Sequence, residues 1–327
     1  MSDTILVINA GSSSIKFQVF ALNGQSGLER QLKGQIESIA VNPHLIAKNA
    51  RGVVLKEASW PAREVPAAPE ALGKVVEFLV EYLGGKLPIA VGHRVVHGGI
   101  QFSAPTVVTP NIAGRLKSIA PDLAKGNVIV AHLGSGASMC ALANGRSIDS
   151  SMGFTALDGL PMGTRPGQLD AGVILYLLQQ KGMTAPEIER LLYNDCGLKG
   201  LSGQSNDVRV LLQSSDPRAQ LAIDFFVHRI AQMAGSLGAA LQGIDGFVFT
   251  AGVGENAPAV RAAVVKRLGW LGAELDEAAN MRGAEVISSK ASRIECRIIP
   301  TDEELMIAEH TLDCLQIVQG RRAESTR

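Results

Sequence analysis

The stretch of sequence that decides the fold is residues 5–20, which read ILVINAGSSSIKFQVF. A short apolar run is followed by a turn of glycine and serine, and a second run alternates apolar and polar residues. Short apolar or alternating runs bounded by turn residues are typical of β-strands. We therefore predict two strands that pair as a β-hairpin with a glycine–serine tip.

The same combination of an apolar strand and a glycine turn recurs twice. Residues 127–138 read NVIVAHLGSGAS, and residues 246–256 read GFVFTAGVGEN. A glycine turn presents backbone N–H groups with no Cβ in the way, which suits it to hold phosphate, especially at a helix N-terminus. One such turn is a weak signal, because ordinary turns share the pattern. Three of them in one chain favour a phosphate-binding protein.

Helical segments separate these strands. We expect helices over residues 69–83, 217–241, 258–268 and 303–315, and further strands over residues 89–92 and 297–300. Alternating strands, glycine turns and helices are typical of an α/β fold. A chain of 327 residues is long enough for two domains.

Composition excludes several classes of protein. Lys plus Arg number 31, and so do Asp plus Glu, so the formal net charge is zero. The charge composition therefore gives no indication of binding to nucleic acid. No apolar stretch approaches the roughly 18 residues of a membrane span, and the N-terminus lacks the pattern of a signal peptide. No two cysteines have a C-x-x-C spacing, so we predict a cytoplasmic protein with free thiols. The four cysteines are Cys140, Cys196, Cys296 and Cys314.

The common phosphate-binding motifs are absent. The chain contains no G-x-x-x-x-G-K-[ST] loop, and no G-x-G-x-x-G opens a dinucleotide-binding unit. The H-R-D and D-F-G motifs of protein kinases are also missing. Phosphate binding by this chain therefore belongs to another kind of fold.

Eight motifs, in order along the chain, resemble those of the acetate kinases. Together they extend from residue 4 to about residue 312, and the chain is identified as a member of that family. The motifs are NAGSSSIKF (9–17), GHRVVHGG (92–99), HLGSG (132–136), DSSMGF (149–154), MGTRPGQLD (162–170), SNDVR (205–209), FTAGVGEN (249–256) and PTDEEL (300–305).

The resemblance implies a fold and an activity. Acetate kinases belong to the actin-like, sugar-kinase-like ATPase superfamily, in which two α/β lobes close on ATP. We expect one lobe from residues 1–122 with 304–327, and the other from residues 123–303. The implied reaction is reversible, Mg²⁺-dependent transfer of a phosphoryl group from ATP to acetate, in a homodimer. The alternatives are a catalytically impaired nucleotide-binding remnant, and a kinase of propionate or another short acid.

The resemblance also implies roles for single residues. Asn9 and Glu303 would help to place Mg²⁺, Ser12 and Lys16 would lie near the phosphates, and Arg94 and Arg165 would hold acetate and the transferring phosphoryl group. The remaining candidates bind the nucleotide. They are His132, Leu133, Gly134, Ser135 and Gly136 at the phosphates, and Asp207, Val208, Arg209, Gly252, Val253, Gly254, Glu255 and Asn256 on the nucleoside side.

Several of these residues also have structural interpretations. Arg94 could form a surface ion pair. His93 and His97 stand four residues apart, but in a glycine-rich stretch, where structural histidines are favoured over a metal site. Asp149 could be an acid on the phosphate side or could cap a turn, and an acidic residue such as Glu303 is favourable at a helix start regardless of any metal.

The resemblance breaks at one place. After its counterpart of Pro121 the family continues into a Pro-Leu-His-Asn stretch, a Phe-Asp-Thr-Ala-Phe-His strand end and a Gly-Phe-His-Gly turn. None of these follows here, and the chain leads directly into the strand that includes Val128. The missing segment carries the family's catalytic aspartate and a histidine that steadies the phosphoryl group. In addition, Ala156 stands where the family more often has proline, near the acid pocket, which leaves the preferred acid open.

Overall fold

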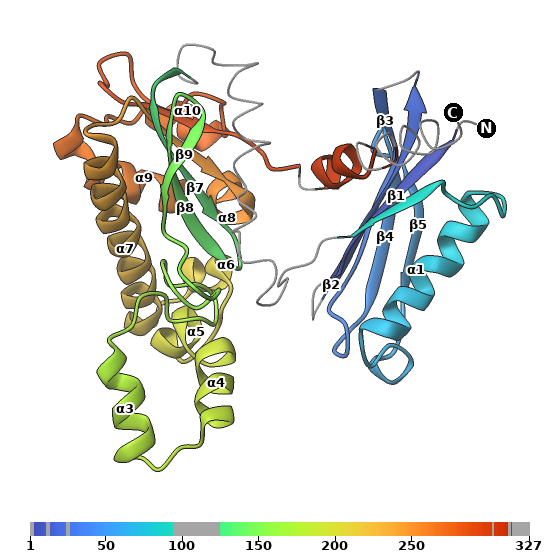
Figure 1. Cartoon of the computed structure of the whole chain (residues 1–327), viewed down its shortest axis with the longest axis horizontal. Helices are drawn as coiled ribbons and strands as arrows, with labels where there is room; N and C mark the ends of the chain where they lie inside the picture. The colour runs from blue at the N-terminus through green and yellow to red at the C-terminus, as the bar shows by residue number, and fades with distance from the viewer. Residues whose placement is uncertain are drawn as a thin grey trace, which may run out of the picture. The chain divides into compact units, whose positions relative to one another are not determined.

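The computed structural model describes residues 3–10, 14–23, 27–93, 125–302, 304–312 and 315. The chain divides into two compact units (Figure 1). Unit 1 comprises Met1–Ala104 with Asp302–Arg327, and unit 2 comprises Pro105–Thr301. Each unit is built on a mixed β-sheet with helices, so the predicted α/β class is confirmed.

Unit 1 contains a six-stranded sheet in the order β5-β4-β3-β2-β1-β6. Its strands are β1 (Thr4–Ala10), β2 (Ser14–Asn23), β3 (Gly27–Glu37), β4 (His44–Asn49), β5 (Val54–Ser59) and β6 (Ala90–His93). β1 and β2 pair antiparallel as predicted, whereas β6 lies parallel to β1. The glycine–serine tip at residues 11–13 is outside the described residues.

Helices cover both faces of this sheet. Side chains alternate along β1, so that Leu6 and Ile8 belong to one apolar cluster and Ile5 and Val7 to another. The first cluster includes Val75, Phe78 and Leu79 of α1 (Ala68–Tyr82), which follows the short η1 (Ala62–Glu64). The second includes side chains from the helical residues 304–312. β1 is buried on both sides, and this explains its uninterrupted apolar sequence.

Unit 2 contains a five-stranded sheet in the order β11-β10-β7-β8-β9. Its strands are β7 (Asn127–Leu133), β8 (Ala137–Ala143), β9 (Arg146–Ser150), β10 (Gly246–Thr250) and β11 (Glu295–Ile298). β7 lies parallel to β10 and antiparallel to β8. The carboxyl ends of β7 and β10 therefore meet at one edge of the sheet.

The long helix α7 (Pro217–Leu241) lies against this sheet and was predicted with the same bounds. The side chain of Asp216 caps its first turn, and it ends at Gln242 in the left-handed conformation. Its buried side chains share one apolar core with β7, β8 and β10. The other helices of unit 2 are α3 (Ala171–Gln179), α4 (Ala185–Asn194), α5 (Gly197–Ser202), α6 (Val208–Gln213), α8 (Ala251–Asn256), α9 (Pro258–Arg267), η3 (Gly269–Leu271) and α10 (Glu277–Arg282).

Two expectations need correction. Residues 251–256 form the short helix α8 and not a glycine turn. The late strand lies two residues earlier than expected, because β11 ends before Ile299. The glycine turn at residues 134–136 joins two antiparallel strands.

Two further features concern the protein as a whole. Within the described ranges, no helix combines the length and the apolar character that crossing a membrane requires. Cys140, Cys196 and Cys296 are free thiols, as expected, whereas Cys314 lies outside the described residues.

Candidate functional site

Two of the three glycine segments lie side by side in unit 2. β7 and β10 pair so that His132 lies opposite Thr250. The tip of the β7–β8 hairpin is closed by a hydrogen bond from Gly134 N to Gly136 O of 2.9 Å. A Cβ placed on Gly134 would lie 3.6 Å from the Cβ of Ala251. The hairpin tip and the start of α8 therefore form one continuous surface of backbone.

The start of α8 has an unusual geometry. Ala251 has a φ of 64°, a conformation that costs energy for a residue with a Cβ. The preceding Thr250 is fully buried, and its Oγ1 has no hydrogen-bond partner in the described part of the chain. A Cβ on Gly252 would meet open space. Backbone strain and an unsatisfied buried hydroxyl at one junction are features that a bound polar ligand would explain.

Arg165 lies against the same hairpin tip. A Cβ on Gly136 would lie only 2.8 Å from Nη2 of Arg165, so an added side chain would displace the guanidinium from its present position. The Nη1 of Arg165 donates to the carbonyl oxygen of Ala156 at 2.7 Å. Desolvation by burial lowers the pKa of Arg165, with a smaller opposing effect of Tyr193. Among the ion pairs of the described residues, none joins Arg165 to a carboxylate.

The loop that carries Arg165 is held from two sides. Gly163 N donates to Ser135 O in the hairpin tip at 3.1 Å. From the start of α5, Leu198 N donates to Met162 O and Lys199 N donates to Gly163 O, both at 2.9 Å. Backbone hydrogen bonds therefore fix the loop of a partly desolvated cation that has no partner anion among the described residues. Such a group is prepared to bind an anionic ligand.

Asp207 and Arg209 are already engaged with one another. The Asp207 carboxylate caps α6 by accepting from Arg209 N at 2.8 Å, and it also accepts from Arg209 Nη2 at 2.6 Å. The side-chain hydrogen bond from Arg209 holds the pKa of Asp207 below its usual value. A Cβ on Gly163 would lie 3.1 Å from the carbonyl oxygen of Asn206. The motif at 205–209 therefore reaches the loop that carries Arg165.

The far end of α8 is held by a residue that the sequence did not single out. Arg261 is only 1% exposed, and its Nη1 donates to the carbonyl oxygens of Gly254 at 3.0 Å and Glu255 at 2.9 Å. Its Nε and Nη2 donate to Oδ1 and the carbonyl oxygen of Asn280. The sequence signal that could have identified Arg261 is its position as the one arginine in an otherwise apolar stretch, PAVRAAVV at 258–265.

The remaining residues of the α8 motif make local contacts. The Glu255 carboxylate accepts from Thr301 N at 3.0 Å, and Asn256 Nδ2 donates to Gly252 O at 2.9 Å. Asp149 accepts from Ser150 N at 2.7 Å and lies exposed in β9. No contact in the described residues brings Asp149 to the hairpin tip or to Arg165.

Unit 1 brings two further candidates together. Asn9 and Lys16 lie directly opposite one another in the β1–β2 pair. Two residues that pair directly across antiparallel strands project their side chains from the same face of the sheet, and an amide oxygen suits Mg²⁺ while an ammonium group suits a phosphate. No three His, Cys, Asp or Glu side chains of the described residues cluster as a metal site would need. Ser12, Arg94 and Glu303 lie outside the described residues.

The residues on either side of Glu303 are held by the unit 1 sheet. Arg30 of β3 pairs with Asp302, and its Nε also donates to Gln18 Oε1 at 2.6 Å. Gln18 of β2 in turn donates to the buried Glu304 carboxylate at 3.2 Å. The chain on both sides of position 303 is therefore anchored to the strands that follow the first glycine motif.

Comparisons with known proteins agree with these features. The model of the acetokinase family matches residues 4–125 and 117–309. An acetate kinase of Nitrobacter hamburgensis is 45% identical, and the alignment covers 96% of each chain. A propionate kinase structure from Francisella tularensis matches with a TM-score of 0.81 at 30% identity, over 96% of this chain and all of that one. The acetate kinase structure from Porphyromonas gingivalis matches with a TM-score of 0.76 at 27% identity, over 96% of this chain and 100% of that one.

The same comparisons confirm the internal gap. The family model matches in two pieces that overlap at residues 117–125, and this is where the expected segment is missing. The alignment with the Nitrobacter protein runs over 390 positions, although this chain has only 327 residues. Several tens of positions are therefore absent from the interior of this chain. Its motifs, its fold and its full-length similarity place it in the acetokinase family, of which it is a member with an internal segment missing.

Proposed function

We propose that the chain transfers a phosphoryl group reversibly from Mg²⁺-ATP to acetate, giving acetyl phosphate and ADP. The observation that carries this proposal is Arg165, a partly desolvated cation that has no carboxylate partner among the described residues and lies against Gly136 of the hairpin tip. The name acetate kinase, given to the Nitrobacter and Porphyromonas proteins, supports the choice of acetate as the acceptor.

The proposed reaction depends little on acid–base catalysis. Acetate is already an anion, so no base has to generate the nucleophile. The difficulty is to bring two anions together, and phosphoryl transfer depends mainly on positioning and on charge stabilisation. The guanidinium of Arg165 can donate paired hydrogen bonds to carboxylate or phosphoryl oxygens. By the family resemblance, Arg94 would supply a second guanidinium.

By the family resemblance, each unit carries residues that we assign to the nucleotide. In unit 2 the hairpin tip 132–136 would receive the phosphates, and Asp207–Arg209 with Gly252–Asn256 would receive the nucleoside. In unit 1 Lys16 and Ser12 would approach the phosphates, and Asn9 and Glu303 would hold Mg²⁺. The bound ion would neutralise charge on the phosphoryl oxygens.

The missing segment favours a second candidate function, a nucleotide-binding remnant with little turnover. In the family that segment supplies an aspartate and a histidine to the transferring group. Loss of a single preorganised donor at such a site typically lowers the rate by about 10²–10³-fold. We therefore expect turnover well below that of relatives that retain the segment, together with nucleotide binding of ordinary strength.

Two measurements on the same preparation test the proposal. Titration with Mg²⁺-ATP measures nucleotide binding, and hydroxylamine traps any acetyl phosphate formed from ATP and acetate. The proposal expects both binding and acetate-dependent hydroxamate. Nucleotide binding without hydroxamate would contradict the proposal and support only the second candidate function, a nucleotide-binding remnant.

The preference of the chain between acetate and propionate can be tested by a substitution at Ala156. Its carbonyl oxygen accepts from Arg165, so this residue lies at the position proposed for the acid. Alanine is smaller than the proline more common in the family, and a buried methylene contributes about 0.8 kcal/mol. We expect Ala156→Pro to shift kcat/KM from propionate towards acetate by about 3–10-fold. An unchanged ratio in parallel assays of the two acids would place the acid elsewhere.

The family resemblance further suggests a cytoplasmic homodimer, and α3 is the surface we assign to it. No residue of α3 is buried, although its sequence, AGVILYLLQ, is almost entirely apolar. Val173, Leu175, Tyr176 and Leu178 are each 38–53% exposed. Exposed apolar patches of this kind mark protein interfaces. Sedimentation equilibrium is expected to show a dimer, and a monomer at micromolar concentration would contradict it.

A further inference from the structure

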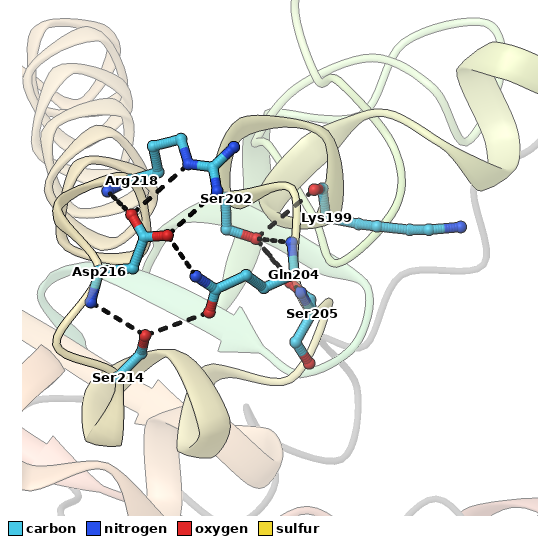
Figure 2. A network of polar contacts seen from close by, with 7 residues as sticks. All are labelled: Lys199, Ser202, Gln204, Ser205, Ser214, Asp216 and Arg218. Carbon is cyan, nitrogen blue, oxygen red and sulfur yellow. Dashed lines mark hydrogen bonds and ion pairs between the residues drawn. The ribbon is translucent and has the colours of Figure 1, made fainter.

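A polar network joins the two segments on either side of α6 (Figure 2). Gln204 lies at its centre. Its Nε2 donates to Asp216 Oδ2 at 2.6 Å, and its Oε1 accepts from Ser214 Oγ at 3.1 Å. Both partners belong to the connection between α6 and α7. A single amide side chain therefore ties the loop before α6 to the loop after it.

The loop before α6 is organised by its own hydroxyl groups. Ser202 is fully buried, and its Oγ accepts from Gln204 N at 3.2 Å and Ser205 N at 3.3 Å (Figure 2). The Oγ of Ser205 then accepts from Asp207 N at 3.0 Å. These bonds fix the turn internally, and Gln204 fixes it to the rest of unit 2.

The other side of the network is anchored in the core. Asp216 caps α7 by accepting from Arg218 N at 2.8 Å, and Arg218 Nη2 donates to it at 3.1 Å. α7 has 25 residues and carries much of the apolar core of unit 2. Gln204 therefore connects the loop to the capped start of a helix that packs in the core.

The loop positions residues of the proposed nucleotide site. Asn206 lies against Gly163 in the segment that carries Arg165, and Asp207 caps α6 and binds Arg209. A small movement of the loop would displace both Asp207 and Arg209. Misplacement of this size is costly in sites that depend on orientation.

We propose that Gln204 is a positioning residue for the nucleotide site, an inference that rests on the proposed function. Gln204 acts through the loop at 202–207 and makes no contact with the nucleotide itself. Its amide fixes the loop to the start of α7, so that Asp207 and Arg209 are held ready for the nucleoside.

The test uses Gln204→Glu, which keeps the shape of the side chain. The substitution places a second carboxylate next to Asp216, where the amide now donates a hydrogen bond, and the two carboxylates repel. We expect the Kd for Mg²⁺-ATP to rise by about tenfold, while the KM for acetate changes by less than about twofold.

Two further variants separate positioning from general damage. Gln204→Glu combined with Asp216→Asn restores a donor–acceptor pair with reversed polarity, and asparagine still caps a helix. This pair is expected to recover the Kd to within about threefold of the original. Gln220→Glu is the matched control, because Gln220 donates to Asp224 at 3.0 Å on the exposed surface of α7. It creates the same pair of acids and should leave the Kd unchanged.

The outcomes separate the inference from the function on which it rests. If the unaltered chain binds no Mg²⁺-ATP, the proposed function fails and the inference fails with it. If the unaltered chain binds and Gln204→Glu binds equally well, only the inference is overturned. It is also overturned if Gln220→Glu loses as much affinity, or if the reversed pair melts like the original chain without recovering its affinity.

Discussion

Replacing Arg165 by alanine is expected to lower kcat for acetyl phosphate formation by about 10²–10³-fold, a loss typical of one preorganised donor at a site of developing charge. The guanidinium donates to Ala156 O, backbone hydrogen bonds hold the loop that carries it, and no carboxylate of the described residues neutralises it. Its charge is therefore available to the reacting groups. Hydroxamate formation at saturating acetate measures the effect.

The controls for Arg165 distinguish chemistry from folding. Arg165→Lys should be little more active than Arg165→Ala, because an ammonium group cannot donate the two parallel hydrogen bonds of a guanidinium. Arg190→Ala, at an exposed arginine of α4, should behave like the unaltered chain. We expect the Kd for Mg²⁺-ATP to change by less than about threefold in Arg165→Ala. Activity retained in that variant would remove Arg165 from the proposed site.

Replacing Arg261 by alanine is expected to lower the free energy of unfolding by about 3–5 kcal/mol, because each buried acceptor left without a donor costs about 1–3 kcal/mol. Arg261 donates to the carbonyl oxygens of Gly254, Glu255 and Asn280 and to Oδ1 of Asn280. These bonds hold α8 against α9 and α10. Urea unfolding followed by circular dichroism measures the loss.

A neighbouring residue provides the control for Arg261. Lys266 lies on the same helix, α9, and is exposed. Lys266→Ala should therefore change the free energy of unfolding by less than about 0.5 kcal/mol. A loss of that small size in Arg261→Ala would show that the buried guanidinium does not secure α8.

Local pattern was enough to predict the elements that carry their own signals. α7 was predicted with its observed bounds, because Asp216 and Pro217 mark its start and its apolar stripe is long. The β1–β2 hairpin and the strands β7 and β10 were predicted from apolar runs next to glycine turns. β3, β4 and β5 were not predicted. β5, for example, is almost wholly exposed and carries no apolar alternation.

The candidate site was predicted in part. Family motifs identified Arg165 and the tip at 132–136, and the structure brings these together in unit 2. Arg261 and Gln204 were missed because their roles depend on partners distant in the sequence or in another loop, Asn280 and Asp216. α8 was taken for a turn because glycine at 252 and 254 disfavours a helix, whereas the hydrogen bonds from Arg261 to the carbonyl oxygens of Gly254 and Glu255 stabilise it here.

The most direct measurement of the central claim is a single turnover with ATP labelled in the γ-phosphoryl group. The enzyme is held in excess over ATP, with Mg²⁺ and acetate present, and the products are separated. Our account predicts label in acetyl phosphate, formed slowly, dependent on acetate and lost in Arg165→Ala. Label that stays in ATP while ATP is fully bound, or that appears only as inorganic phosphate, would contradict it.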